Sequence, residues 1–318
     1  MHEPQNTNSH SAEPLPLVLL VGPTAVGKTD VAIDLAEMLD GEIVSADSRL
    51  FYRGMDIGTA KPSAGERRGV PHHLIDIVSP AETLSLADFQ SRAREAITQI
   101  ASRGKLALLV GGTGQYVRAV VEGWSPPAVE PQAGLRDILA RLKDEQGADW
   151  LHRRLAQLDP QAAEKIDPRN SRRTIRALEV ILTTGRLFSA QQRRSASPYQ
   201  LLTIGLERPR PELYARVDAR IDAMFAAGLL EEVRGLLERG YGPELPAMSA
   251  IGYRECARVL HGEWTVEQAK SEMRRATRVY VRRQANWFKQ SDENIRWFEA
   301  DQVATSQIAG VIRSFLHV

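Results

Sequence analysis

Short apolar runs alternate with amphipathic segments along the first third of the chain. Residues 15–21 (LPLVLLV), 42–46 (EIVSA) and 106–110 (LALLV) are almost continuously apolar. Runs of this length are typical of strands that are buried on both faces of a parallel sheet. A helical pattern that begins at Thr29 separates the first run from the second. The order strand, helix, strand therefore predicts an α/β fold with a parallel sheet flanked by helices.

Local signals mark the ends of several predicted helices. A Ser or Thr followed three positions later by an acid or Gln caps a helix start, and an Asp-Pro pair supplies a cap and a first helical residue. A glycine directly after the last turn ends a helix. Such signals occur at Ser85 with Asp88, at Arg103-Gly104, at Asp159-Pro160, at Gly185, and at Thr265 with Gln268.

The pattern changes after Gly123. Residues 124–132 contain three prolines, which is typical of the exit from a domain. Residues 133–188 are helical in pattern, and strand patterns return only at 199–206 and 294–298. The sequence thus predicts an α/β core that is interrupted by an all-helical insertion. The predicted divisions are a disordered tail at 1–16, a core made of 17–123 and 199–318, and an inserted domain at 124–198.

Composition narrows the class of protein without indicating a partner. The 318 residues are enough for a sizeable core, and 41 Lys and Arg nearly balance 40 Asp and Glu. The single cysteine, Cys256, excludes an intramolecular disulfide, and we interpret it as a small buried apolar residue rather than a nucleophile. We see no leader-like segment and no apolar run of about twenty residues that could span a bilayer. We expect a cytoplasmic monomer that does not interact with a membrane.

The positive charges are unevenly distributed. Residues 169–194 contain seven arginines against one acid, Glu179, and residues 270–296 contain eight basic residues against three acidic ones. In the second stretch Tyr280 and Trp287 are interleaved with the arginines. Basic residues with aromatic neighbours are typical of a nucleic-acid surface. A solvated helix with its aromatic side chains in the core explains the same pattern, and both interpretations stay open at this point.

The stretch GPTAVGKT lies between the first predicted strand and the first predicted helix. Its pattern, G-x-x-x-x-G-K-[ST], is the phosphate-loop motif, in which backbone N–H groups and a helix N-terminus surround phosphate oxygens. Lys28 adds positive charge, and the hydroxyl of Thr29 can reach Mg²⁺. We therefore predict a site for a diphosphate or triphosphate at Gly22, Pro23, Thr24, Ala25, Val26, Gly27, Lys28 and Thr29.

Asp47 directly follows the second predicted strand. It places a carboxylate at the carboxyl edge of the sheet beside the phosphate loop, which is where ligands bind in such folds. A turn at the end of a strand explains an aspartate equally well. The polar stretch that continues to Pro62 is punctuated by glycines, which favours a loop that wraps a substrate.

Two other short features have both structural and functional interpretations. Residues 111–116 (GGTGQY) form a second glycine-rich turn at the same edge, where Thr113 could hydrogen-bond a ligand, but a tight turn alone explains the glycines. The pair His72-His73 lacks spaced partners that would complete a metal site, so we favour a structural role for it.

Arg216 and Arg220 lie one turn apart on a predicted helix, residues 211–224. Their spacing places them on one face of the helix, from which both can point at an anion. Pairing with Asp218 or Asp222 on the same helix is the alternative.

Taken in order and spacing, these motifs resemble the tRNA dimethylallyltransferase family, bacterial type. The similarity runs from about Leu17 to about Phe298, and the stretch ADSRLFYRGMDIGTAKP is close to diagnostic. The other shared motifs are GPTAVGKT, PHHLIDI, VGGTGQY, NSRRTIRALEV, AIGYRE and RRQANWF. The resemblance implies a fold like that of the phosphate-loop NTPases. It also implies transfer of a dimethylallyl group from its diphosphate to the N6 amine of the adenine 3′-adjacent to the tRNA anticodon, with release of diphosphate and Mg²⁺ as the cofactor.

The resemblance implies roles for individual residues. Asp47 would be the general base, and Thr24, Lys28 and Arg220 would bind the diphosphate while its bond breaks. Thr29 would hold the Mg²⁺. Contacts with the anticodon stem-loop of tRNA are implied at Asp47, Ser48, Arg49, Leu50, Thr113, Arg136, Arg172, Arg173, Thr174, Ile175, Arg176, Ser249, Gly252, Tyr253, Arg254, Arg282, Arg283, Gln284 and Trp287.

Two rival classes share parts of the pattern. A small-molecule or nucleoside kinase would have a phosphate loop and an aspartate after the second strand, and it would use ATP. The two basic stretches have no role in such a kinase. A GTPase-like switch is a non-enzymatic alternative, but the sequence has no N-K-x-D stretch to read guanine.

Overall fold

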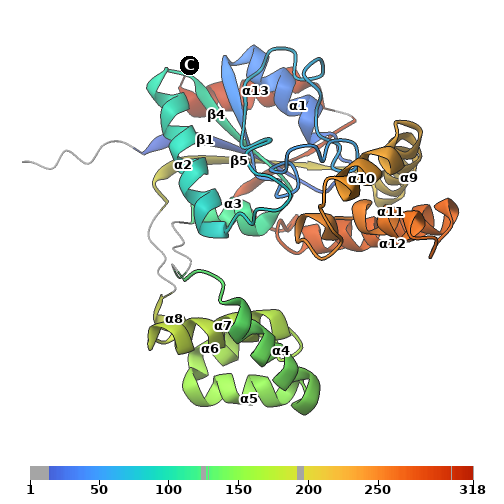
Figure 1. Cartoon of the computed structure of the whole chain (residues 1–318). Coiled ribbons are helices and arrows are strands. Elements are labelled where there is room, and N and C mark those ends of the chain that lie inside the picture. Colours follow the sequence, from blue (N-terminus) through green and yellow to red (C-terminus); the bar gives the residue numbers. More distant parts are fainter. Residues whose placement is uncertain (1–13, 123–126, 128, 192–196, 302, 318) are drawn as a thin grey trace, which may run out of the picture. The chain divides into compact units, whose positions relative to one another are not determined.

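Among the residues that the structure describes, six strands form one parallel sheet (Figure 1). The computed structural model describes residues 14–122, 127, 129–191, 197–301 and 303–317. The strands are β1 Leu15–Val21, β2 Gly41–Ser45, β3 His72–His73, β4 Leu106–Val110, β5 Tyr199–Glu207 and β6 Ile295–Glu299, in the order β3-β2-β4-β1-β5-β6. The predicted parallel sheet is confirmed, and β3 is a short edge strand that the hydrophobic pattern did not reveal.

Strand β1 lies inside the sheet, between β4 and β5. Leu15 and Pro16 pair with Tyr199 and Gln200 of the long strand β5. The prediction of a tail that extends to residue 16 was therefore wrong, because β5 offers backbone partners to these two residues and they become part of β1. Residues 1–13 of that predicted tail lie outside the described residues.

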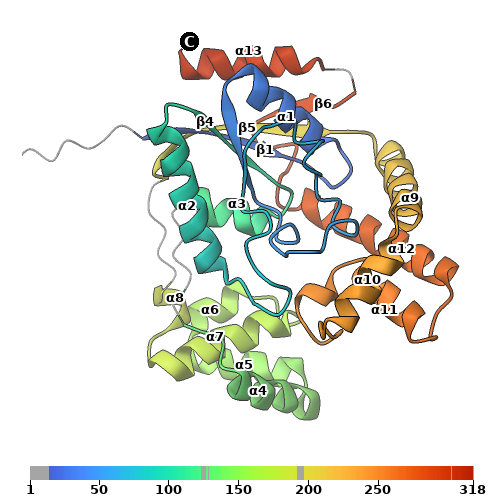
Figure 2. The ribbon, with the colours of Figure 1, turned by 45° about the horizontal axis from the view of Figure 1, so that its top comes forward.

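Helices cover both faces of the sheet (Figure 2). The first helix after the phosphate loop, α1 (Lys28–Met38), packs against the last helix, α13 (Thr305–Leu316), and both contribute to one apolar core with the inner strands. On the other face, α2 (Leu86–Ser102) contacts β2 and β4. This arrangement leaves the carboxyl edge of the sheet free for loops that follow β1, β2 and β4.

The predicted capping signals are confirmed. The hydroxyl of Ser85 accepts a hydrogen bond from the backbone N–H of Asp88 (3.1 Å), and the Asp88 side chain accepts one from the Ser85 backbone. Gly104 follows the end of α2 with φ +71°, in the left-handed region. Thr265 and Gln268 form the same reciprocal box at the start of a later helix, α12 (Val266–Ala285).

Four helices after β5 gather at one side of the sheet (Figure 2). They are α9 (Arg210–Ala226), α10 (Leu229–Glu238), α11 (Tyr253–Leu260) and α12. Helix α12 contacts both α9 and α11. No helix within the described ranges is long and apolar enough to cross a membrane.

The helical unit is compact by itself. It contains α4 (Ala133–Gln146), α5 (Ala148–Leu158), α6 (Pro160–Lys165), α7 (Ser171–Thr184) and α8 (Phe188–Gln191), around a buried apolar cluster. Contacts divide the chain into residues 1–117 with 198–318 and residues 118–197, whereas the sequence pattern placed these divisions at 123/124 and 198/199. The first division falls inside α3 (Gly114–Val121). The predicted caps of this unit are confirmed, since Asp159 accepts from Ala162 N–H and Gly185 ends α7 with φ +66°.

His72, His73 and Cys256 all have structural surroundings. His73 Nε2 lies 2.7 Å from a carboxylate oxygen of the buried Glu42, and His72 Nδ1 lies 2.8 Å from the carbonyl oxygen of Val70. Burial raises the pKa of Cys256 to about 12, which disfavours the reactive thiolate.

Candidate active site

The phosphate loop joins β1 to α1 through backbone conformations that favour glycine. φ is +147° at Gly22 and +107° at Gly27. A side chain at Gly22 would also overlap the carbonyl oxygen of Leu206 in β5. The N–H groups in the first turn of α1 have no partner inside the helix, so the loop has the geometry that surrounds an anion.

Lys28 is tied back onto this loop. Its ammonium group donates to the carbonyl oxygens of Gly22 (3.0 Å) and Pro23 (2.8 Å), which leaves one of its three N–H donors for a ligand. Loss of hydration lowers the pKa of Lys28 to about 8, while Asp47 opposes that shift and Arg220 adds to it. The ammonium group is therefore still charged near neutral pH.

Arginines from the other side of the core brace the same loop. The Nε–H of Arg216 donates to the carbonyl oxygen of Ala25 (2.7 Å), and that of Arg208 donates to Val26 (3.1 Å). Arg220 lies one turn beyond Arg216 on α9 and lines the cavities described below. The two arginines on this face thus act differently: one holds the loop, and the other faces open space.

The acids of α9 do not pair with these arginines. Asp218 receives Arg278 of α12 (2.6 Å), and Asp222 receives Arg274 (2.8 Å) and Lys270 (3.3 Å) of the same helix. The alternative in which Asp218 or Asp222 neutralises Arg216 or Arg220 is therefore wrong. Helix α9 turns its acids toward α12 and its two arginines toward the phosphate loop.

Asp47 follows β2 at the carboxyl edge, where it both forms a turn and faces a cavity. One carboxylate oxygen accepts the backbone N–H of Arg49 (2.9 Å), as in an ordinary aspartate turn. The side chain also lines the space in front of the phosphate loop together with Thr24, Lys28 and Arg220. The turn therefore fixes the position of a carboxylate that faces a cavity.

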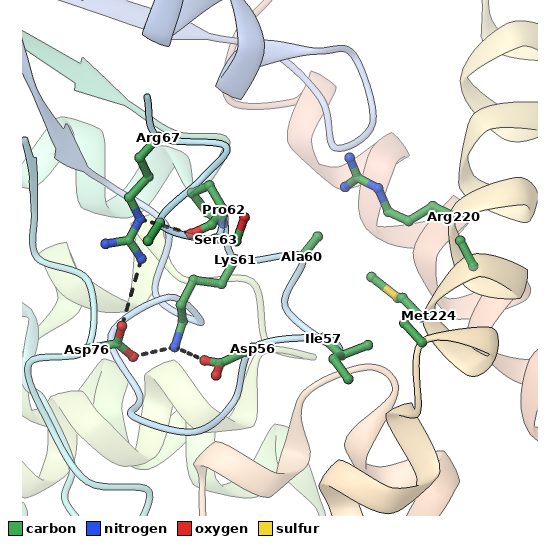
Figure 3. A pocket seen from close by; sticks show the side chains of 13 residues that line it. Asp56, Ile57, Ala60, Lys61, Pro62, Ser63, Arg67, Asp76, Arg220 and Met224 are labelled. Carbon is green, nitrogen blue, oxygen red and sulfur yellow. Dashed lines mark hydrogen bonds and ion pairs between the residues drawn. The ribbon is translucent and has the colours of Figure 1, made fainter. Parts of the chain in front are cut away.

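Three cavities meet in this region. The loop cavity, about 320 Å³, is lined by the phosphate loop and Asp47. The central cavity, also about 320 Å³, lies between Asp47, α9 and α12. The outer cavity, about 540 Å³, lies between α9 and the stretch 56–64 (Figure 3). Ala60 and Arg220 line all three, so Arg220 stands at their junction.

The central cavity is lined by both polar and apolar side chains. Its polar side chains include Thr24, Asp47, Thr113, Arg220, Thr277 and Tyr280. Its apolar side chains include Val217, Ile221, Met224, Ile251 and Met273. A ligand that fills it can therefore make both hydrogen bonds and van der Waals contacts.

Lys61 organises the stretch that separates the cavities (Figure 3). Its ammonium group is almost fully buried and lies 2.6 Å from Asp56 and 2.5 Å from Asp76, and it donates to the carbonyl oxygen of Tyr52 (2.8 Å). Figure 3 shows this group on the wall of the outer cavity opposite Arg220 and Met224. Sequence reasoning did not assign it a role, because nothing local shows that residues 56, 61 and 76 meet.

Glu232 of α10 holds the same stretch from the other side. Its carboxylate accepts the backbone N–H groups of Asp56 (2.9 Å), Ile57 (2.8 Å) and Gly58 (3.3 Å), and also the hydroxyl of Tyr253 (2.6 Å). A side chain at Gly58 would overlap the ring of Tyr253. Tyr253, predicted to contact RNA, is fully buried in this arrangement. Sequence reasoning missed Glu232.

The second glycine-rich turn follows β4 and adjoins the phosphate loop. The hydroxyl groups of Thr113 and Tyr280 lie 3.3 Å apart, and both residues line the central cavity. Gln284 bonds to the phosphate loop and to this turn, and it is 4% exposed. Gln284 was predicted to contact RNA, but its amide is taken up inside the protein.

Other residues with a predicted RNA contact lie after β2, at the start of α11 or at the end of α12. Arg49 donates to the carbonyl oxygen of Pro246 (3.1 Å) and to the hydroxyl of Ser249 (3.4 Å). Arg254 is paired with the buried Glu255. Ser48 and Leu50 lie with Arg49 in the segment after β2, and Gly252 directly precedes α11. Arg282, Arg283 and Trp287 are exposed.

The predicted RNA residues of the helical unit divide into two groups. Arg136 and Arg176 bond to the buried Glu179 (2.8 and 2.7 Å); burial would raise the pKa of that carboxyl, but these hydrogen bonds outweigh it and lower the pKa. Thr174 is buried, and Ile175 packs against the apolar cluster. Arg172 and Arg173 are exposed, with no ion-pair partner among the described residues. Among the predicted RNA contacts of this unit, only Arg172 and Arg173 carry a charge that has no ion-pair partner in the described part of the chain.

A bound Mg²⁺ would need oxygen ligands from a bound diphosphate as well as from the protein. No group of three or more His, Cys, Asp or Glu side chains in the described part of the chain could hold a metal ion. Thr29, at the start of α1, lines the loop cavity together with Asp47. Mg²⁺ is commonly bound through one or two protein oxygens plus substrate phosphates, so the donor set fits a Mg²⁺ that arrives with a diphosphate.

The fold and the site together define a phosphate-loop α/β protein with a carboxylate, an ammonium group and a guanidinium around two adjoining cavities. The family model of IPP transferase matches residues 50–291. The chain belongs to this family, that of the tRNA dimethylallyltransferases, which are prenyltransferases.

Similar proteins support this assignment along most of the chain. A tRNA dimethylallyltransferase of Roseiflexus castenholzii is 55% identical over 275 residues, which cover 86% of this chain and 90% of the relative. One of Thermomicrobium roseum is 49% identical, with 90% and 87% covered. The solved full-length tRNA isopentenylpyrophosphate transferase of Bacillus halodurans has a TM-score of 0.71 at 43% identity, covering 95% and 97%. A eukaryotic dimethylallyltransferase acting on tRNA has a TM-score of 0.82 at 27% identity, covering 95% and 80%.

Proposed function

We propose that this chain transfers the dimethylallyl group from dimethylallyl diphosphate to the N6 amine of the adenine 3′-adjacent to the anticodon in tRNA, and releases diphosphate. The observation that carries the proposal is that the loop cavity and the central cavity share Thr24, Asp47 and Arg220. A diphosphate in the first cavity and a base in the second would meet at one carboxylate. The names of the relatives supply the two substrate classes.

The donor side is built to stabilise a departing diphosphate. The allylic carbon can carry positive charge as its C–O bond breaks, so much of the barrier lies in the negative charge that grows on the leaving group. The N–H groups of the loop, the remaining donor of Lys28 and the guanidinium of Arg220 would face that charge. Thr29 would help to hold Mg²⁺, which when bound neutralises charge on the diphosphate.

The acceptor side is built around Asp47. An adenine amine is a weak nucleophile because its lone pair is delocalised into the ring, and a carboxylate that accepts one of its protons makes it more reactive. The new N–C bond forms as the C–O bond breaks; the proton passes to Asp47, and the electron pair of the C–O bond leaves with the diphosphate. The base must leave its stack to reach the central cavity, at a cost of a few kcal/mol.

The exposed arginines would bind the RNA backbone. Arg172 and Arg173 in the helical unit and Arg282 and Arg283 at the end of α12 are free of ion pairs among the residues described. Such charges bind phosphates of an RNA loop while its bases are splayed out. A monomeric state and a cytoplasmic location stay predictions from the sequence.

A kinase would use the same loop differently. Transfer of a phosphoryl group to a nucleoside needs no apolar lining, yet Val217, Ile221, Met224 and Met273 line the central cavity. These apolar side chains suit a branched five-carbon chain. They favour prenyl transfer over phosphoryl transfer.

The test uses purified protein, unmodified tRNA, dimethylallyl diphosphate and Mg²⁺. We expect diphosphate release in step with a prenyl mass increment on the tRNA, without any need for ATP. Asp47→Asn should slow the reaction about a hundredfold or more, because an amide oxygen still accepts the Arg49 N–H but is a poor base. ADP formation that depends on a nucleoside acceptor, with no prenylated RNA, would establish the kinase instead.

A further inference from the structure

Gln284 joins the two glycine-rich turns at the carboxyl edge of the sheet. Its Oε1 accepts the backbone N–H of Thr24 in the phosphate loop (2.8 Å). Its Nε2 donates to the carbonyl oxygen of Gly112, in the turn that follows β4 (3.1 Å). The side chain is buried, so both hydrogen bonds are shielded from water.

The position requires an amide in one orientation. A Cβ at Gly112 would overlap the Gln284 nitrogen, so the glycine is what allows this approach. A carboxylate in the same place would set a second acceptor against the Gly112 carbonyl, and an apolar side chain would leave two buried backbone groups without partners. Gln284 therefore adds a side-chain link between the two glycine turns, beyond the backbone pairing of β1 with β4.

Gln284 belongs to the helix that carries exposed positive charge. Arg282 and Arg283 directly precede it in α12, and both side chains are exposed. One turn earlier, Tyr280 contacts Thr113 in the same glycine-rich turn. A shift of the end of α12 would therefore move the Gln284 amide relative to Thr24, the phosphate-loop residue to which it is hydrogen-bonded.

We propose that Gln284 is a positioning residue that couples RNA binding at the end of α12 to the geometry of the phosphate loop. RNA held by Arg282 and Arg283 fixes the end of α12, and Gln284 passes that constraint to Thr24 and so to the diphosphate site. The inference rests on the proposed function for its RNA ligand. Because such coupling is reciprocal, each ligand tightens the binding of the other by the same factor.

The experiment measures the affinity for inorganic diphosphate with Mg²⁺, alone and with a saturating tRNA anticodon stem-loop. We expect the stem-loop to tighten diphosphate binding about fivefold or more in the wild-type protein, within the usual range of such couplings. In Gln284→Leu the ratio of the diphosphate affinities with and without the stem-loop should fall to about one. The RNA affinity and its salt dependence should stay within about twofold of the wild-type values. Arg275→Gln, on the exposed face of the same helix, is the control and should keep the wild-type ratio.

Gln284→Glu separates positioning from folding. At neutral pH the introduced carboxylate opposes the Gly112 carbonyl, and the coupling should be lost. At acidic pH the protonated carboxyl group can donate to Gly112 and accept from Thr24, so the coupling should return. Thermal unfolding of each variant verifies that it is folded.

The outcomes distinguish this inference from the proposed function. A wild-type ratio near one, with both ligands bound, would overturn the coupling and leave prenyl transfer standing, as would an unchanged ratio in Gln284→Leu. Failure of the wild-type protein to bind the stem-loop would overturn the proposed function, and this inference with it.

Discussion

Helices α7 and α12 carry the two basic stretches of the chain, and they use their charges differently. In the helical unit, Arg176 of α7 and Arg136 of α4 converge on one fully buried acid, Glu179. In the core, Lys270, Arg274 and Arg278 of α12 reach across to Asp218 and Asp222 of a second helix, α9. The first arrangement closes a local cluster, whereas the second joins two helices of the site.

A basic stretch does not by itself define an RNA surface. Nearly half of the described charges in these stretches have ion-pair partners within the protein. The others are exposed without an ion pair among the residues described: Arg172, Arg173, Arg186, Arg282, Arg283, Lys289 and Arg296. In α12 the internal pairs also occupy Asp218 and Asp222 of α9, so neither acid pairs with Arg220. An arginine count therefore overstates the exposed positive charge and hides the contacts that these side chains make within the protein.

The largest expected effect separates Arg220 from the arginines of α12. Arg220→Ala should slow prenyl transfer by roughly 10² to 10³-fold, about 3 to 4 kcal/mol, because it removes a donor from the growing charge of the leaving group. Arg275, which pairs only with its neighbour Glu272, is the control, and its alanine variant should stay within about twofold. Single-turnover formation of prenylated tRNA measures both. Similar rates in the two variants would remove Arg220 from the mechanism.

The second prediction concerns the buried acid of the helical unit. Glu179→Gln should lower the free energy of unfolding of that unit by about 2 to 3 kcal/mol, because it leaves two arginines without their charged partner. This is below the usual cost of breaking a buried pair, since Arg136 and Arg176 are partly exposed and can be hydrated. Asp167→Asn, which breaks an exposed pair with Arg169, should change it by less than about 0.5 kcal/mol. Chemical denaturation checks the difference; equal changes would contradict the assigned roles.

The exposed arginines of the two stretches should set the salt dependence of tRNA binding. Replacing Arg172 and Arg173 by alanine should flatten the log–log plot of tRNA affinity against salt by about 1.4 to 1.8, and replacing Arg282 and Arg283 should do the same. Arg136→Ala should leave the slope unchanged, because that guanidinium is bound to Glu179. Titrations at several salt concentrations measure the slopes. A flatter slope for Arg136→Ala would show that Arg136 contacts RNA phosphates in spite of its pairing with Glu179.

The smallest effect is a pH dependence at Lys28. Its pKa of about 8 means that the free protein loses this charge above pH 8, whereas a bound diphosphate favours the protonated form. Binding should therefore take up a proton, and affinity for diphosphate should fall about fivefold between pH 8 and pH 9. Lys28→Arg keeps its charge and corrects for titration of the ligand. Calorimetry in two buffers detects the proton; equal pH profiles in both proteins would exclude Lys28.

Local patterns predicted most of the fold. The buried strands, the phosphate loop and the capping boxes depend on residues within a few positions of one another, so Gly22 to Thr29 and Ser85 with Asp88 could be recognised directly. The short strand β3 could not, because its pairing with β2 decides it.

The site was predicted less completely, for the same physical reason. Asp47 and Lys28 follow strands and can be placed at the sheet edge from sequence. Gln284 meets Thr24 across 260 positions, and Glu232 meets Ile57 across 175. Glu232 lies outside the motifs, and nothing within RRQANWF indicates that Gln284 bonds to Thr24. Only the packing of α10 and α12 against the core reveals what they hold.

The place of β1 in the sheet has a consequence for synthesis. Its two neighbours are β4, near residue 110, and β5, which begins at Tyr199, and the helical unit lies between them in the chain. During translation, one side of β1 has no partner until the ribosome has released the whole helical unit. That unit is contiguous and can fold first, while the apolar edge of β1 must wait. The unpaired edge of β1 can therefore mispair during an interval whose length is set by the helical unit. Mutations that delay the emergence of β5 from the ribosome should lower the yield of folded protein before they affect catalysis.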